Sequence, residues 1–265
     1  MFDRQTIERR YLRTERGQLH LRIAGKTGPR PPLLLLHQVP NSGQIFEPVM
    51  PALAHDRCVI AVDTPGYGMS DPIPDPQTIE GYADVIGGAI GELVGEPLDV
   101  VGYHTGAAIA AVLATRSRPR VRRIALVAVP VLNDAERKEF AALPPIPFDE
   151  AGDWAREEWR RSWHWRGPGQ TRDDLLKSFA EKMRPTARLQ GARAIVAFDM
   201  TKALHAVRQS LLIVRPRDDL WEATARAAAL RPDAPCVNLP DFGHGLWSVA
   251  SERMVQILKE FFDAP

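Results

Sequence analysis

The sequence is poor in cysteine and has no long apolar run. Its two cysteines, Cys58 and Cys236, are too few for a disulfide framework, and both lie in apolar, strand-like segments. We therefore expect two buried thiols in a reducing cytoplasm. The longest apolar run, at residues 124–132, is far shorter than the roughly 18 residues that a membrane-spanning helix requires. The N-terminal stretch is charged throughout and lacks the apolar core of a signal peptide.

The sequence also has almost no net charge. It carries a formal charge of +1, and its basic residues form no block, so it predicts neither a nucleic-acid partner nor binding to an anionic membrane. With 265 residues, 45% of them hydrophobic and 25% charged, the chain can bury a large core. The oligomeric state stays open, a homodimer included.

Short apolar runs alternate along the chain with segments of helical periodicity. Four consecutive leucines at residues 33–36 are typical of a strand covered on both faces. Further strands are expected at residues 58–62, 98–102, 121–130, 210–216 and 236–240. Helical patterns occupy residues 45–54, 79–93, 107–116, 223–230 and 251–262, and a hairpin is expected at residues 10–25. This alternation predicts an α/β fold with a mostly parallel, doubly wound sheet.

Residues 133–200 interrupt the alternation. They contain no run typical of a buried strand, yet they hold four of the six tryptophans, Trp154, Trp159, Trp163 and Trp165. We interpret this segment as a helical cap inserted into a core formed by residues 1–132 and 201–265.

Residues 100–106, VVGYHTG, have the form of a tight strand-to-helix turn. Gly102 and Gly106 bracket three residues, and small residues that favour a helix follow. Glycine at those two positions removes side chains that would clash in a strained turn. In an esterase the central residue is a nucleophilic serine, but here it is His104. Histidine is among the residues that tolerate a positive φ angle, so His104 is compatible with the turn.

Five motifs together identify the chain as similar to the α/β-hydrolase family over essentially its whole length. They are LLLLHQVPNSG, VDTPGYGMSD, the turn VVGYHTG, LLIVRPRDD and DFGHGLWS, in that order. The family places a nucleophile, an acid and a histidine in the same chain order. The resemblance implies an α/β-hydrolase fold and the catalytic residues His104, Asp218 and His244, with Asp219 as the alternative acid. The acyl-serine mechanism does not carry over, because His104 stands where the serine would be.

The resemblance also implies an oxyanion hole and a substrate pocket near the turn. The oxyanion donors are the backbone N–H groups of Val39 and Thr105, which do not depend on the identity of residue 104. Residues expected to line the pocket are His37, Gln38, Tyr103, Trp159, Trp163 and Trp247. A solvated helix face, rather than a carboxylate clamp, is the preferred interpretation of the cap arginines Arg156, Arg160, Arg161 and Arg166.

These residues predict cofactor-free hydrolysis of a small carbonyl-containing substrate, such as an ester or a lactone. We expect Asp218 to pair with His244 and to leave His104 neutral, because two adjacent imidazoles disfavour double protonation. General acid–base action by the two histidines is preferred over an acyl-imidazole intermediate on His104.

Three alternatives remain at the level of sequence. The same residues can serve a lyase or a decarboxylase. His104 can instead mark a catalytically inactive protein that retains a ligand pocket. A zinc ion on His37, His104 and His244 is disfavoured because their spacing carries no metal signature.

Overall fold

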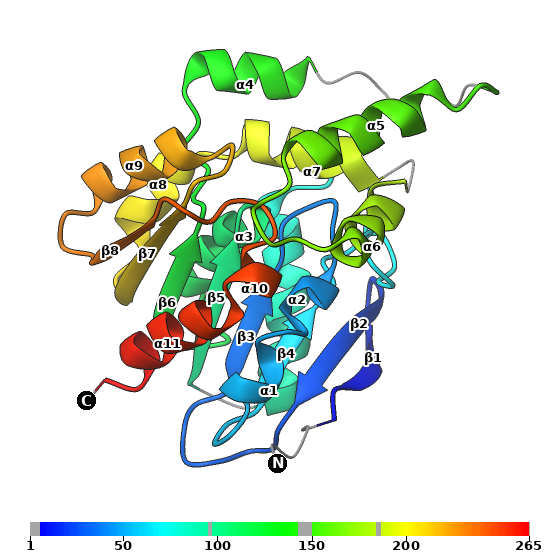
Figure 1. Cartoon of the computed structure of the whole chain (residues 1–265). Coiled ribbons are helices and arrows are strands. Elements are labelled where there is room, and N and C mark those ends of the chain that lie inside the picture. The colour runs from blue at the N-terminus through cyan, green and yellow to red at the C-terminus, as the bar shows by residue number, and fades with distance from the viewer. Residues whose placement is uncertain (1–5, 95–96, 143–149, 184–186, 265) are drawn as a thin grey trace.

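The computed structural model describes residues 6–94, 97–142, 150–183 and 187–264. Its centre is an eight-stranded sheet with the order β1-β2-β4-β3-β5-β6-β7-β8 (Figure 1). The strands are β1 (Glu8–Thr14), β2 (Gly17–Ala24), β3 (Leu33–Leu36), β4 (Val59–Val62), β5 (Leu98–Tyr103), β6 (Val121–Val127), β7 (Ser210–Pro216) and β8 (Cys236–Leu239).

The six strands from β4 to β8 in the sheet order are parallel, whereas β1 and β2 form an antiparallel hairpin and β2 runs antiparallel to β4. The predicted α/β class, with a mostly parallel sheet, is confirmed. Strands β3 and β4 are buried at every position, as the unbroken apolar runs require in a sheet covered on both faces.

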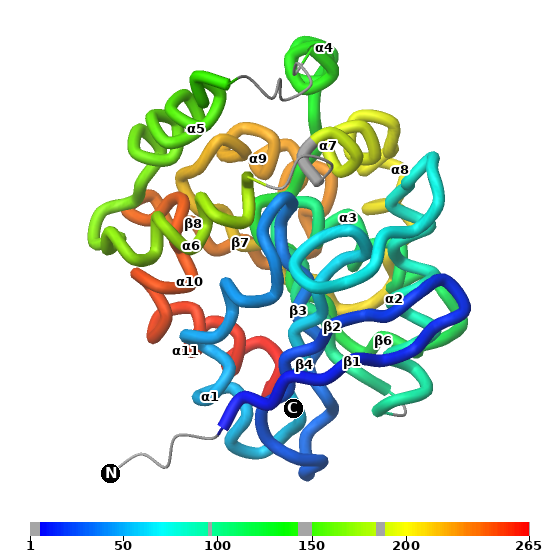
Figure 2. The backbone as a smooth tube through the Cα atoms, turned by 90° about the vertical axis from the view of Figure 1, so that its right-hand side faces the viewer, coloured from blue at the N-terminus to red at the C-terminus, as the bar shows by residue number. Residues whose placement is uncertain are grey.

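Helices cover both faces of the sheet. Figure 2 shows α1 (Met50–Leu53) and α11 (Ser251–Phe262) on one side and α2 (Ile79–Val94) and α3 (Thr105–Thr115) on the other. Two short elements, α9 (Trp221–Leu230) and α10 (Leu246–Val249), lie near the C-terminus. The single helix expected at residues 45–54 is wrong: a 3₁₀ turn, η1 (Gly43–Phe46), precedes the one-turn α1, with Pro48 between them and Pro51 in the first turn of α1.

Five helices lie between β6 and β7. They are α4 (Asp134–Ala141), α5 (Asp153–His164), α6 (Arg172–Lys182), α7 (Ala187–Ala197) and α8 (Met200–Ala206). Helix α5 packs against α6, and α4 packs against α7, while α8 packs against α3 and α9 of the sheet layers. In Figure 1, α4 to α7 lie together above the sheet. Within the described part of residues 133–200 there is no strand, and no helix in the described ranges is long and apolar enough to cross a membrane.

Candidate active site

His104 occupies a strained turn between β5 and α3, with φ 53° and ψ −115°. Its backbone N–H donates to Val127 O at 3.0 Å, and its carbonyl accepts from Ala107 N at 2.8 Å. The flanking glycines are required by close approach. A Cβ atom on Gly102 would lie 2.3 Å from Gly106 O, and one on Gly106 would lie 2.1 Å from Leu36 O. The turn therefore holds the side chain of His104 in one place at the end of the parallel strands.

The His104 imidazole reaches the acid that follows β7. Its Nε2 lies 2.9 Å from Asp218 Oδ2, and because a carboxylate can only accept, Nε2 carries the hydrogen. The other Asp218 oxygen accepts from Leu220 N at 2.9 Å, and the Asp218 side chain is fully buried. Both oxygens of Asp218 are thus held in fixed directions.

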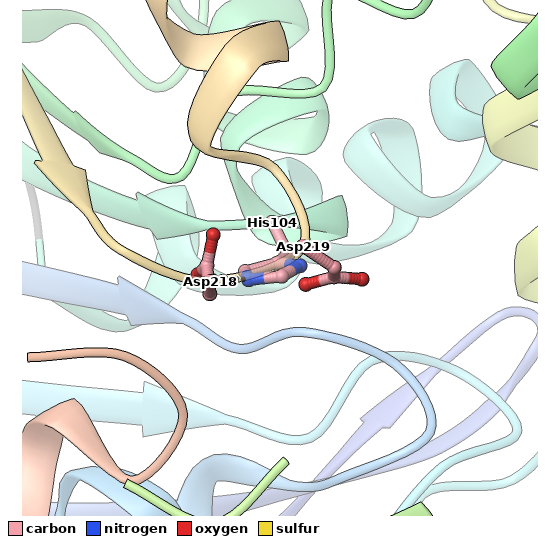
Figure 3. Close-up of side chains that lie close together, drawn as sticks. All are labelled: His104, Asp218 and Asp219. Carbon is pink, nitrogen blue, oxygen red and sulfur yellow. Dashed lines mark hydrogen bonds and ion pairs between the residues drawn. The ribbon is translucent and has the colours of Figure 1, made fainter.

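His244 has a different carboxylate partner. Its Nε2 lies 3.2 Å from Asp219 Oδ1, and its ring centroid is 6.0 Å from that of His104. The expected pairing of Asp218 with His244 is therefore wrong. The imidazole at position 104 is longer than a serine side chain and takes Asp218 for itself, and its ring lies between the carboxylates of Asp218 and Asp219 (Figure 3).

The charged side chains around the two imidazoles shift the pKa values of His104 and Asp219. Burial by itself lowers the pKa of His104, but the carboxylates of Asp218 and Asp219 outweigh burial, so the pKa of His104 is raised above its ordinary value. Partial burial favours protonation of Asp219, yet the hydrogen bond from His244 and the nearby His104 ring hold the pKa of Asp219 well below its usual range. The expectation that Asp218 favours the charged form of His244 is overturned, because Asp218 bonds to His104 and favours the charged form of that ring instead.

A cavity of about 250 Å³ lies over the two imidazoles. Val39, Thr105, Asp219 and Gln38 line it together with His104 and His244. Neither the Val39 N–H nor the Thr105 N–H donates to an acceptor in the described ranges of the chain. Val39, Thr105 and the two imidazoles therefore line one space. Helices α4 to α7 line its other side with residues Phe140, Glu158, Arg161, Ser162, Leu175, Ser178, Lys182, Gly191, Ala192 and Ile195.

Two of the predicted pocket residues lie in a neighbouring cavity. Tyr103 and Trp247 are both buried and line a second space of about 210 Å³, which shares Gln38 with the first. The Tyr103 ring packs edge-on against His104, with 4.4 Å between centroids, and against Trp247, with 5.8 Å between centroids. These aromatic rings support the His104 imidazole from behind.

His37 does not reach either cavity. It is completely buried, its Nδ1 donates to Gln38 O at 2.8 Å, and its Nε2 accepts from Thr64 N at 2.9 Å. With both nitrogens engaged by backbone, the ring supports the loop after β3. The substrate-binding role predicted for His37 is replaced by a structural one.

The cap contributes a different tryptophan from those predicted. Trp159 packs against Phe179 and Trp163, and Trp163 is exposed. Neither lines the cavity, whereas Trp165 does, with its ring centroid 5.9 Å from that of His244.

The helix face turned to the cavity carries Glu158, Arg161, Ser162 and Trp165. Their spacing of three and four residues is one side of a helix. The pair at 159 and 163 lies one position further around the helix, where Trp159 packs against Phe179 of α6 and Trp163 is exposed. Periodicity therefore indicated an aromatic face, but it did not indicate which face of the helix meets the cavity.

One group of side chains in the described residues has the composition of a metal site. Ligand atoms of His104, Asp218 and Asp219 lie within 4.8 Å of one another. Hydrogen bonds to imidazole and to backbone already account for their positions. The three-histidine site considered above is ruled out by geometry, because neither nitrogen of His37 has a lone pair directed to the cavity.

Comparison with known proteins agrees with this architecture. The family model of the alpha/beta hydrolase fold matches residues 31–180. The chain is 26% identical over 278 residues to 2-(acetamidomethylene)succinate hydrolase of Mesorhizobium japonicum, covering 95% of each chain. It is also 26% identical over 252 residues to pimeloyl-(acyl-carrier protein) methyl ester esterase of Stenotrophomonas maltophilia, covering 90% of this chain and 95% of the relative. The crystal structure of a hydrolase from Pseudomonas aeruginosa superimposes with a TM-score of 0.82 at 19% identity, covering 97% of this chain and 98% of that one.

The chain belongs to the α/β-hydrolase fold family. The named relatives are hydrolases and esterases, and they support a hydrolase here.

Proposed function

We propose that the protein hydrolyses a small ester or lactone by general acid–base catalysis, with two histidine–aspartate pairs in place of a serine triad. The observation that carries the proposal is the pair of imidazoles on one cavity, 6.0 Å apart between centroids, with His104 Nε2 hydrogen-bonded to Asp218 and His244 Nε2 3.2 Å from Asp219 Oδ1. Each carboxylate orients its imidazole, and the second nitrogen of each ring is left for chemistry.

The two histidines take different roles in this proposal. The raised pKa of His104 favours its protonated form, which donates a proton from Nδ1 to the leaving oxygen. His244 uses its Nδ1 as the base that removes a proton from the attacking water. Amide N–H groups of Val39 and Thr105 stabilise the oxyanion, a contribution that is typically about 3 kcal/mol per donor.

An acyl-imidazole on His104 is disfavoured for an electrostatic reason. Nucleophilic attack requires a neutral ring with a free lone pair, whereas Asp218 and Asp219 favour the imidazolium form of His104. Direct attack by water avoids this conflict. Helices α4 to α7 serve as the cap that shields the water and the substrate from bulk solvent.

The test is hydrolysis of a panel of small chromogenic esters and lactones by the wild type and by His104→Ala and His244→Ala. We expect each substitution to lower kcat by about a hundred- to ten-thousandfold, the usual contribution of a general acid or base. Rapid-quench mass spectrometry should detect no acyl adduct on the protein. His205→Ala is the matched control, because His205 is exposed on α8 and lines neither cavity.

The outcomes separate the alternatives. An acyl adduct on His104 would establish the covalent route. Full activity in His244→Ala would exclude His244 as the base. A wild type that hydrolyses no ester or lactone, but binds a small carbonyl compound and releases it unchanged, would favour a ligand-binding protein.

A further inference from the structure

One cationic side chain of the cavity has no counter-charge. Arg161, on α5, lines the cavity that contains His104 and His244. The other cap cation there, Lys182, lies 3.3 Å from Glu158 Oε1 and donates to Ser162 Oγ at 3.1 Å. No carboxylate or other acceptor among the described residues pairs with the guanidinium of Arg161.

The two carboxylates that line the cavity with Arg161 do not neutralise its positive charge. The carboxylate of Glu158 is buried beside Lys182, and that of Asp219 lies 3.2 Å from His244 Nε2. Phe140, Leu175 and Ile195 add apolar side chains to the same wall, next to the polar Ser162 and Ser178. An unpaired guanidinium beside apolar walls favours an anion with two acceptor oxygens, which it binds through two parallel hydrogen bonds.

Arg161 lies one helical turn from Trp165, whose ring is next to His244. Its carbonyl accepts the backbone hydrogen bond of Trp165 N at 3.0 Å, so the two residues are one helical turn apart on the same face. The Trp165 ring in turn lies 5.9 Å from that of His244. Arg161 therefore stands one turn of α5 beyond the residue that contacts the proposed base.

We infer that Arg161 binds a carboxylate group of the substrate, and that the substrate is an acidic ester or lactone rather than a neutral one. The inference rests on the proposed hydrolytic function and adds the class of substrate to it. The arginine holds the anionic end in the cap while the carbonyl carbon lies over the imidazole pair.

The experiment compares two substrates of matched length, 4-nitrophenyl hydrogen succinate and 4-nitrophenyl butyrate. For Arg161→Gln we expect kcat/KM on the acidic ester to fall by about ten- to a hundredfold, the value of a lost hydrogen-bonded charge pair. The loss should appear chiefly in KM, and kcat/KM on the butyrate should fall by a much smaller factor. Arg161→Lys should retain part of the preference, because an ammonium keeps the charge but loses the two-point geometry.

Arg160→Gln is the matched control. Arg160 is the neighbouring residue of α5, its side chain is 77% exposed and its Nη1 lies 3.7 Å from Glu157, and it does not line the cavity. It carries the same charge, so a general effect of net charge on an anionic substrate would appear in both variants. An unchanged ratio of the two substrates in Arg161→Gln, or an equal change in Arg160→Gln, overturns the inference.

A binding measurement separates this inference from the proposed hydrolysis. Succinate is titrated into the wild type and Arg161→Gln, with intrinsic tryptophan fluorescence as the readout, because the Trp165 ring lines the same cavity. Weaker succinate binding in Arg161→Gln supports the anion site even if no ester is hydrolysed. Equal binding of succinate by both proteins rejects the site, whatever the outcome of the hydrolysis assays.

Discussion

Asp218 and Asp219 are adjacent in the chain, yet their carboxylates hold different histidines. Asp218 bonds to His104 at 2.9 Å, and Asp219 lies 3.2 Å from His244. Successive residues at the end of β7 point to opposite sides of the His104 ring (Figure 3). A single strand end therefore orients both imidazoles, and substitution at either aspartate should affect a different half of the chemistry.

The pH dependence of hydrolysis should report on the bond between His104 and Asp218. A general acid is active when protonated, so kcat/KM should fall as pH rises through the raised pKa of His104, above 6.5. In Asp218→Asn this alkaline limb should move to lower pH, because the neighbouring negative charge is lost. The profile is measured on a neutral ester, so that the substrate does not titrate.

Asp233→Asn provides the control for this profile. Asp233 is a surface carboxylate paired with Arg231, remote from both cavities. Its removal should leave the alkaline limb in place. A limb that stays unchanged in Asp218→Asn as well would mean that His104 does not supply the proton.

The turn that carries His104 should tolerate no side chain at Gly106. A Cβ atom there would meet the backbone of Leu36, at 2.1 Å from O and 2.5 Å from C, and backbone atoms cannot rotate away. We expect Gly106→Ala to lower the free energy of unfolding by about 3 kcal/mol and to lose activity by displacing the turn.

A second glycine gives the opposite expectation from the same substitution. Gly88 lies within α2, is exposed, and has no atom within 4 Å of a Cβ placed on it. Gly88→Ala should raise the free energy of unfolding by about 1 kcal/mol, because alanine favours the helix. Urea unfolding of both variants checks the pair. Similar stabilities for the two would show that the close approach at Gly106 is relieved by movement of the chain.

The strands were predictable because burial on two faces demands apolar runs that the sequence displays directly. The four leucines of β3 and the hairpin of β1 and β2 are found where the pattern places them. The segment at residues 45–54 has helical apolar spacing, but Pro48 and Pro51 divide it into two short turns. The spacing of apolar residues indicates which side chains are buried. It does not indicate whether one continuous helix or two short turns carry them.

Three of the expected site residues lie together, but their pairing differs from the one expected. Chain order and strand ends bring His104, Asp218 and His244 together, as the sequence indicated. Which carboxylate each imidazole contacts depends on the length of the His104 side chain and on the directions in which Asp218 and Asp219 point. The sequence pattern does not determine either of these. The same limit applies at α5, where Trp165, two residues after Trp163, lines the cavity instead.

A buried carboxylate under the loop after β4 should dominate part of the acid sensitivity. Asp63 is fully buried and accepts from His20 Nδ1 at 2.9 Å, Arg22 Nη1 at 2.8 Å, Gly43 N at 2.8 Å and Met69 N at 3.0 Å. Burial favours its protonated form, but the bonds from His20 and Arg22 outweigh burial and lower the pKa of Asp63 to about 2.

The lowered pKa of Asp63 means that its stabilising contribution is complete above its unfolded pKa of about 3.9 and is lost as pH falls through its folded pKa of about 2. This loss should amount to about 2 kcal/mol. In Asp63→Asn the free energy of unfolding should be lower at neutral pH by about 3 kcal/mol and should fall less steeply over this acid range. Urea unfolding from pH 5 to 2 compares the two slopes. A carbon-13 titration of Asp63 in the wild type gives the pKa directly, and a value near 4 would contradict the assignment.

Two buried tyrosines should respond in opposite directions when their hydroxyl groups are removed. Tyr82 O–H donates to Gln77 Oε1 at 2.6 Å, whereas the Tyr103 hydroxyl is buried without a hydrogen-bond partner in the described part of the chain. Because an unsatisfied buried hydroxyl is costly, Tyr103→Phe should raise the free energy of unfolding by about 1 kcal/mol, and Tyr82→Phe should lower it by about as much. Both rings are fully buried, so the apolar surface removed from water is the same in each pair of proteins. Thermal and urea unfolding of the two variants, measured without ligand, provide the comparison. A loss of stability in Tyr103→Phe equal to that in Tyr82→Phe would mean that an ordered water satisfies the Tyr103 hydroxyl at the second cavity.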